Sequence, residues 1–155
     1  MRRSTRWPLA LALLAAPVHA GVITVDDSGG ADFFDLPPAV AAAQDGDLIL
    51  VHPGLYSAFA LQAKSLTILG LASGQVRVDG STSVSFVPAG SDASLVDLDF
   101  QFLVLPNSPG TIVLDGVGVW GPTLGRLSVD GCADVRAIGM HLDAAASHVP
   151  FECCG

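Results

Sequence analysis

Two aspartates separated by one residue carry the clearest potential chemistry in the chain. Asp97 and Asp99 alternate with Val96, Leu98 and Phe100, and in a strand such alternation places the apolar side chains inward and the carboxylates outward on one face. Calcium takes about six to eight oxygen ligands, many of them from carboxylates. Asp97 and Asp99 are therefore candidate ligands for Ca²⁺, the one cofactor that the sequence suggests.

Three further aspartates could extend that acidic face. Asp79, Asp115 and Asp130 each end a short β-rich segment and precede a glycine, and they would lie near Asp97 and Asp99 if the segments stacked in register. Outward-facing carboxylates also commonly form a solvated surface without a ligand. The sequence leaves both interpretations open, and it assigns no catalytic residue.

Aromatic side chains offer a second kind of binding chemistry. Flat aromatic rings pack against the apolar faces of pyranose rings, and Trp120, Tyr56 and Phe102 are the candidates for such stacking. Trp120 falls in a predicted loop, which favours it, and Tyr56 is the second residue of the predicted carbohydrate site. Each ring could instead pack over a turn and protect the edge of the fold.

Histidine and cysteine give weaker signals. His141 and Asp143 form an i, i+2 pair that could bind a metal, transfer protons or simply lie on the surface. Cys132 lies on a predicted turn, and in an oxidising compartment it would pair with Cys153 or its neighbour Cys154. Zinc is disfavoured because the chain has no Cys-x-x-Cys pattern and no suitably spaced Cys/His set.

Residues 1–20 have the three parts of a secretory signal. A basic region opens the chain, residues 9–16 are apolar, and the small residues of 18–20 provide a cleavage site. We therefore expect cleavage before Gly21 and a secreted, periplasmic or cell-surface protein. Prolines on both sides of the apolar run disfavour a retained anchor, so no membrane span is expected after cleavage.

The remaining chain is strongly acidic. After residue 20 it keeps four basic residues against all 15 acidic ones, a formal net charge of −11, compared with −8 for the whole sequence. Such a charge repels a phosphate backbone and disfavours nucleic acid as a partner.

The first part of this remaining chain carries a dense set of local signals. The β-branched run Val22–Val25 predicts a strand. Asp35 predicts the cap of a short helix with prolines in its first turn, in which Leu36, Val40 and Ala43 share one face. An Asp-Gly pair then predicts the helix stop, and a Pro-Gly pair predicts a type II turn.

From Ser65 onward the chain is a series of short β-rich segments. The predicted strands are 66–69, 76–78, 84–87, 96–100, 102–105, 112–114, 127–129 and 135–142. In the last of these, Ile138, Met140 and Leu142 are expected to point inward. A strand-Asp-Gly pattern recurs at 76–80, 112–116 and 127–131, which favours the stacked coils of a solenoid. An antiparallel β-sandwich is the alternative, and the lack of Asn-Gly hairpin signals disfavours it.

The order of turn, helix, turn, strand and turn over 29–56 resembles the opening of secreted right-handed parallel β-helix proteins of the pectin-lyase-like class. The resemblance implies that the helix covers the open end of the solenoid. We therefore expect an all-β fold, a right-handed parallel β-helix with a short N-terminal capping α-helix. Residues 21–64 would form the cap and first coil, and 65–155 further coils of the same domain. We also expect the parallel β-helix to be incomplete at the C-terminus, where no capping segment is recognisable.

The fold class leaves the activity open, because one such scaffold hosts lyases, hydrolases, esterases and binding modules. Our first expectation is a non-catalytic binding or structural module with polysaccharide as its partner. The alternative is the N-terminal part of a pectate-lyase-like polysaccharide lyase. In that case the resemblance implies calcium on an acidic face and an arginine as the base, and Arg77, Arg126 and Arg136 are present without a pattern that ties them to the acids.

Overall fold

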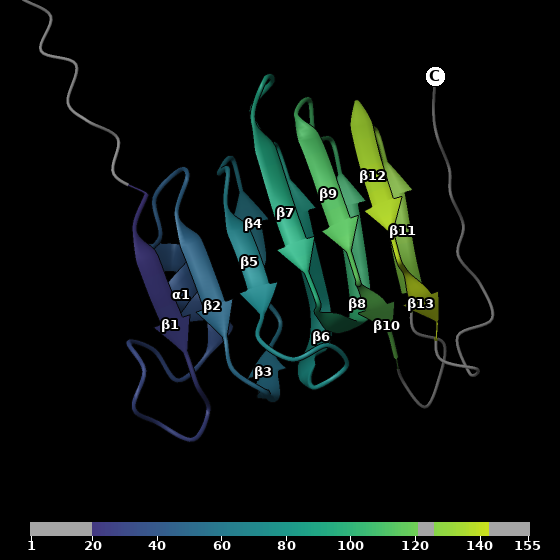
Figure 1. The fold of residues 1–155 in the computed structure, drawn as a ribbon. Helices are drawn as coiled ribbons and strands as arrows, with labels where there is room; N and C mark the ends of the chain where they lie inside the picture. The colour runs from purple at the N-terminus through teal and green to yellow at the C-terminus, as the bar shows by residue number, and fades with distance from the viewer. Residues whose placement is uncertain (1–19, 121–125, 143–155) are drawn as a thin grey trace, which may run out of the picture.

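Two parallel sheets wind along one axis as a β-solenoid of about five turns (Figure 1). The computed structural model describes residues 20–120 and 126–142. The predicted signal over 1–20 therefore lies almost wholly outside the described residues. All strand pairs in the described part of the chain are parallel, which excludes the antiparallel sandwich and confirms the predicted fold class.

After the first coil, in which α1 follows β1, each coil contributes one strand to the first sheet and one or two strands to the second. The first sheet has the order β1 (Val22–Val25), β2 (Leu48–Val51), β5 (Thr67–Gly70), β7 (Asp92–Val96), β9 (Thr111–Asp115) and β12 (Asp134–Ile138). The second sheet contains β3 (Gly54–Ser57), β4 (Ala60–Gln62), β6 (Val76–Ser85), β8 (Asp99–Pro106), β10 (Gly118–Val119), β11 (Arg126–Asp130) and β13 (His141–Leu142). The chain alternates between the sheets, so consecutive strands of one sheet come from successive coils.

Apolar side chains stack in register along the inside of both sheets. In the first sheet Ile49, Ile68, Leu95 and Leu114 lie one above the other and are fully buried. Burying a side chain of this size stabilises a fold by about 1.5–3 kcal/mol. The regular coil therefore lets each strand cover the core residue of the strand before it.

The second sheet carries a matching inner stack. Tyr56, Val78, Phe100 and Val119 occupy equivalent positions in four successive coils, and all four are buried. The core thus lies between the two sheets, and side chains at the alternate positions of the second sheet face outward.

Helix α1 (Leu36–Ala42) begins at the predicted cap and packs on the first coils. The Asp35 carboxylate accepts a hydrogen bond from the Leu36 amide at 2.8 Å. Leu36, Val40 and Ala43 are buried as predicted, and the helix contacts β1, β3 and β4. The expectation that a short helix packs at the N-terminal end of the solenoid is confirmed.

A lysine from the first coil holds the other end of the helix. The ammonium group of Lys64 donates hydrogen bonds to the carbonyl oxygens of Val40, Ala41 and Ala43 at 2.9, 3.1 and 2.7 Å. The last carbonyls of a helix have no partner within the helix, and a cation at this end also offsets the negative pole of the helix dipole. Lys64 therefore acts as the C-terminal cap.

Two of the predicted strands cross a corner of the coil. The segments 96–100 and 135–142 were expected to be continuous, but each turns between the sheets at a residue with positive φ, Asp97 (53°) and Gly139 (61°). Ile138 is consequently 60% exposed instead of pointing inward. The predictions were wrong because the alternation of apolar and polar residues in the sequence continues across the corner, where a single residue with positive φ changes the direction of the chain.

The strand-Asp-Gly pattern does not mark equivalent positions of successive coils. Asp79–Gly80 lies inside β6, whereas Asp115 is the last residue of β9 and Asp130 is the last residue of β11, each followed by its glycine. In the observed register, Gly116 lies next to Asp97, and Gly131 lies next to Asn107. The inference of stacked coils was right, although the pattern that led to it is not the structural repeat.

Candidate functional site

One outward-facing position of the second sheet runs through every coil. Leu55, Arg77, Asp99, Gly118 and His141 are paired in register along this line. Their neighbours in the strands point into the core, so these side chains can only point away from it. Four chemically different groups and one glycine are thereby placed side by side on one face.

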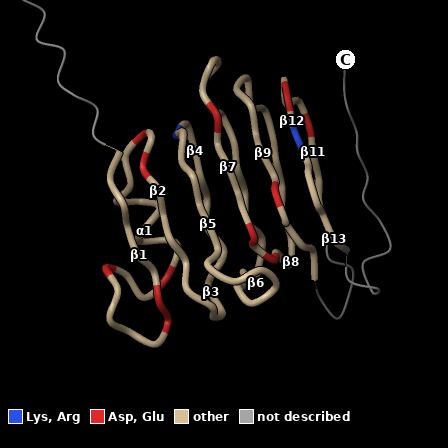
Figure 2. The backbone as a smooth tube through the Cα atoms, viewed as in Figure 1, with Lys and Arg blue, Asp and Glu red and all other residues tan. Residues whose placement is uncertain are grey.

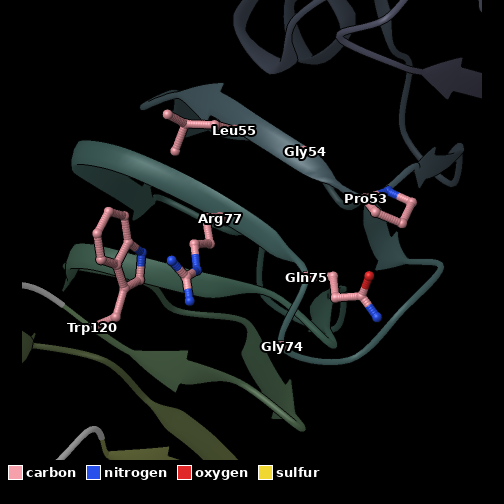
Figure 3. A pocket seen from close by; sticks show the side chains of 7 residues that line it. All are labelled: Pro53, Gly54, Leu55, Gly74, Gln75, Arg77 and Trp120. Atoms are coloured by element: carbon pink, nitrogen blue, oxygen red, sulfur yellow. The ribbon is translucent and has the colours of Figure 1, made fainter.

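A surface pocket of about 580 Å³ opens at the N-terminal end of this line (Figure 3). Its lining residues come from three different coils: Pro53, Gly54, Leu55, Gly74, Gln75, Arg77 and Trp120. The loop 71–75 between β5 and β6 is longer than the other four described corners between the first and second sheets, each of which has two residues. This extra length supplies one wall of the pocket.

Trp120 and Arg77 form the polar end of the pocket. The guanidinium carbon of Arg77 lies 5.2 Å from the centre of the indole ring, and Figure 3 shows the two side chains facing one another. Such a cation–π contact contributes about 0.5–1 kcal/mol at an exposed position. The contact fixes the orientation of both groups at the pocket rim.

The rest of the pocket surface is apolar or amide. Leu55 is 57% exposed and lies on the strand next to Arg77, while Gln75 comes from the loop that forms the wall. The indole Nε1 is buried and has no hydrogen-bond partner among the described residues. The pocket thus combines a flat ring, a cation, an amide and an exposed aliphatic side chain.

A carboxylate and an imidazole meet further along the same line. His141 Nε2 lies 3.2 Å from Asp99 Oδ1, and the side chains are 52% and 10% exposed. The contact is close enough for an ion pair when His141 is protonated, but the buried Asp99 Oδ1 has no hydrogen-bond partner in the described part of the chain. The two groups can meet across two coils because Gly118, which lies between them, has no side chain.

The structure separates the two residues of the predicted carbohydrate site. Trp120 lies on the surface of the second sheet, at the pocket. Tyr56 points into the core, is 2% exposed, and donates a hydrogen bond from its hydroxyl to the His52 carbonyl at 2.8 Å. Burial raises the pKa of the Tyr56 hydroxyl above its ordinary value. Placing Tyr56 at a sugar-stacking surface was therefore wrong.

The two predicted calcium ligands lie on different parts of the coil. Asp97 occupies the corner after β7, whereas Asp99 begins β8 on the outer face of the second sheet. The acidic residues are spread along the solenoid and do not form one ladder (Figure 2). Within 20–120 and 126–142, no group of three His, Cys, Asp or Glu side chains could hold a metal ion.

The remaining sequence candidates are only partly placed. Cys132 is partly buried, and its thiol donates a hydrogen bond to the Leu105 carbonyl at 3.0 Å. Cys153 lies outside the described residues, so the predicted disulfide stays a prediction. Asp143, the expected partner of His141, also lies outside them.

Sequence reasoning missed the group that completes the pocket. Arg77 was known only as one of three arginines without a pattern, and neither Leu55 nor Gln75 was a candidate. Their proximity to Trp120 depends on the number of residues in the coils between them. The alternation of apolar and polar residues predicts strands, but it does not predict this number. The one available signal was the glycine-containing segment 71–75, which marks an enlarged corner.

Comparisons of the chain with protein-family models, with curated proteins and with solved structures found no significant match. The class of the protein is therefore the one that its fold defines, a parallel β-solenoid with a helix near its N-terminus. Among the described residues, no helix has both the length and the apolar character needed to cross a membrane.

Proposed function

We propose that this protein is a secreted or cell-surface β-helix module that binds a polysaccharide through the pocket at Trp120 and Arg77. The observation that carries the proposal is the indole ring held at the rim of an open pocket beside a guanidinium group. A ring face can pack on the C–H groups of a sugar, while the guanidinium and the Gln75 amide supply hydrogen-bond donors for hydroxyl or carboxylate oxygens.

The shape of the pocket supports a chain ligand better than a small enclosed one. Its walls come from separate coils along the solenoid axis, and it is open to solvent on the outer face of a sheet. A polymer could lie across this face and leave in both directions. The N-terminal segment resembles that of pectin-lyase-like proteins, which agrees with a carbohydrate ligand. Because the proteins of this resemblance are secreted, a secreted location is part of the proposal.

Tryptophan fluorescence gives a direct test. Trp7 lies in the predicted signal, so a protein that begins at Gly21 has Trp120 as its single tryptophan. Titration with a panel of neutral and acidic polysaccharides should shift its emission for at least one of them. Calorimetry on Trp120→Ala should then show an affinity loss of about tenfold, the equivalent of about 1.4 kcal/mol.

Two matched variants make this test specific. Trp120→Phe keeps a flat ring and should retain part of the affinity. Phe34→Ala removes another exposed aromatic side chain, 69% exposed, and should leave the affinity unchanged. No binding to any member of the panel, or equal losses for Trp120→Ala and Phe34→Ala, would contradict the proposal.

A second candidate function is the N-terminal part of a pectate-lyase-like enzyme. It is favoured by one observation, the placement of Arg77, Asp99 and His141 on the same outer line of the second sheet. Incubation of the protein with polygalacturonate, with and without calcium, would reveal unsaturated products by their ultraviolet absorbance. Product formation that is lost in Arg77→Gln would favour this function over binding alone.

A further inference from the structure

A buried carboxylate contacts the first residues of the folded chain. Asp47, which is 7% exposed, directly precedes β2. One of its oxygens accepts a hydrogen bond from the Gln44 amide at 2.7 Å, and the other accepts one from the Gly21 amide at 2.6 Å. These two bonds lower the pKa of Asp47 below its ordinary value of 3.8, so the group is ionised at neutral pH.

No cation of the described chain forms an ion pair with this carboxylate. Lys64 is the charged group that acts on it, and the Lys64 ammonium is engaged by three carbonyl oxygens at the end of α1. The nearby Asp45 carboxylate accepts a hydrogen bond from the Ser65 amide. Asp47 is therefore a buried anion that two neutral amides satisfy, and a cation in place of one amide would add Coulombic attraction to the hydrogen bond.

The residue at one of those amides is the first residue after the predicted signal. Gly21 is partly buried, whereas Ala20 is exposed, so the bond between them lies at the surface. A Cβ atom at position 21 would lie only 3.0 Å from Asp47 Oδ1, so this close approach suits glycine. The sequence signal and the geometry of Asp47 are independent observations that point to the same bond.

We propose that cleavage of the Ala20–Gly21 bond creates an α-ammonium group that binds Asp47 and locks the first strand onto the second. Cleavage by a secretory endopeptidase adds one water across the peptide bond. Ala20 leaves with the new carboxylate, and the Gly21 nitrogen becomes an ammonium ion. The donor of the 2.6 Å hydrogen bond between Gly21 and Asp47 thereby changes from a neutral amide to a cation, and the bond becomes an ion pair.

The lock would act at an exposed edge of the fold. β1 is the first strand of its sheet, and Gly21 directly precedes it. The Gly21 carbonyl also accepts a hydrogen bond from the Leu48 amide at 2.9 Å. An ion pair at this point would hold the start of the edge strand in register, while the unprocessed chain has only the weaker amide bond there.

The test compares two proteins that differ in one group. The chain from Gly21 is prepared with a free amine and with an acetylated amine, because acetylation restores a neutral amide N–H. At neutral pH the free-amine protein should have an unfolding equilibrium constant about five to ten times smaller, since the ammonium adds Coulombic attraction to a carboxylate that accepts a hydrogen bond in both proteins. Equal stabilities would overturn the proposal.

The partner is tested by Asp47→Asn in both backgrounds. The advantage of the free amine should shrink to less than about twofold, because the carboxylate charge is gone. If Asp47→Asn does not fold, a chain that retains Ala20 before Gly21 replaces it. That chain moves the charge by one residue and should behave like the acetylated protein, and full stability in it would equally overturn the proposal.

The pH dependence gives an independent readout. An α-amino group has an ordinary pKa of about 8, and an ion pair with Asp47 should raise it in the folded state. The advantage of the free amine is then complete below about pH 8 and disappears as pH rises through the folded pKa. Lys64 is identical in both proteins, so its titration cancels in the comparison.

The processing step itself is tested on the protein exported by cells. Its N-terminal residue, read by sequencing or intact mass, should be Gly21. A different first residue would overturn the assignment of the cleaved bond, even if the purified chain from Gly21 gains stability from its free amine.

Discussion

Gly118 is the position where one added methyl group should have the largest local effect near the candidate site. A Cβ atom there would overlap Asp99 Oδ1, lie 3.0 Å from Asp99 Cγ and lie 2.7 Å from His141 Nε2. Since contacts below 3.0 Å are not tolerated by a real Cβ, the carboxylate and the imidazole must both move. Overpacking of this kind costs about 1–3 kcal/mol, and we expect Gly118→Ala to lose about 2 kcal/mol of unfolding free energy.

The cause of this loss can be isolated with a double-mutant cycle. Ala in place of Gly inside a strand would otherwise gain about 0.5–1 kcal/mol from the reduced entropy of the unfolded chain. In the background Asp99→Ala the main overlap is absent, and His141 is exposed enough to turn away. Gly118→Ala should therefore be neutral or slightly stabilising in that background, with a coupling energy of about 2 kcal/mol.

Urea unfolding followed by circular dichroism measures all four proteins. The slope of the transition should stay constant, so that a change in midpoint reports stability. A loss of the same size in both backgrounds would refute the reasoning, because the overlap with Asp99 would then not be its source. A Gly118→Ala protein as stable as the parent would refute the register that brings Asp99 and His141 together.

Three further predictions concern the scaffold. Lys64→Met should lower the free energy of unfolding by about 1–3 kcal/mol and increase amide hydrogen exchange in α1, because it removes three hydrogen bonds to the helix end. Leu95→Ala should cost about 2–5 kcal/mol in urea unfolding, whereas Ser94→Ala on the opposite face of β7 should change little. Hydrogen bonds from the Thr24 amide, and then from its hydroxyl, lower the pKa of Asp32 below 3.8. Its stabilising contribution is therefore complete above about pH 4 and lost as pH falls through the folded pKa, and Asp32→Asn should flatten the acid side of the stability curve.

The N-terminal part of the fold could be predicted because its signals are local. The cap at Asp35 accepts the amide of the next residue, and the face formed by Leu36, Val40 and Ala43 follows from helix geometry alone. The cap and the buried face depend on residues within a few positions of one another, so a single sequence contains them. The predicted helix stop at Gly46 was wrong, because α1 already ends at Ala42 with Ala43 in an extended conformation, and Gly46 adopts its positive φ of 86° in the turn that follows.

The later corners could not be predicted because many of them lack the usual turn residues. Ala63, Phe86 and Asn107 occupy equivalent places in successive coils with φ of 52°, 58° and 47°. A positive φ is energetically unfavourable for a residue with a large side chain such as Phe86. The local sequence contains no signal that predicts this conformation. The neighbouring coil fixes the backbone there, since the Phe86 amide donates to the Asn107 carbonyl at 3.2 Å.

The same physics explains why Trp120 could be proposed from the sequence while its surroundings could not. Ring chemistry and a predicted loop were enough to select Trp120, and they were also enough to select Tyr56, which the register turns into the core. Whether an aromatic residue faces inward or outward depends on how many residues separate it from the preceding corner. One residue more or fewer at a corner reverses the direction of the side chains that follow it. The chemical type of a residue therefore selects candidates, and the register decides which of them lie on the surface.

The pocket exists where the coil departs from its own regularity. Four of the described corners between the first and second sheets contain two residues, and three of these, at 97–98, 116–117 and 139–140, belong to successive coils. The loop 71–75 is the exception, and its Gly74 and Gln75 line the pocket together with Leu55 and Arg77. A uniform stack of coils buries its core well but presents a smooth outer face, so a concave site requires an insertion at one coil or a large side chain at another. This solenoid has both, because the enlarged corner supplies one wall and Trp120 supplies the other (Figure 3). The regular stack therefore accounts for stability, and the two irregular positions account for the place at which a ligand can be held.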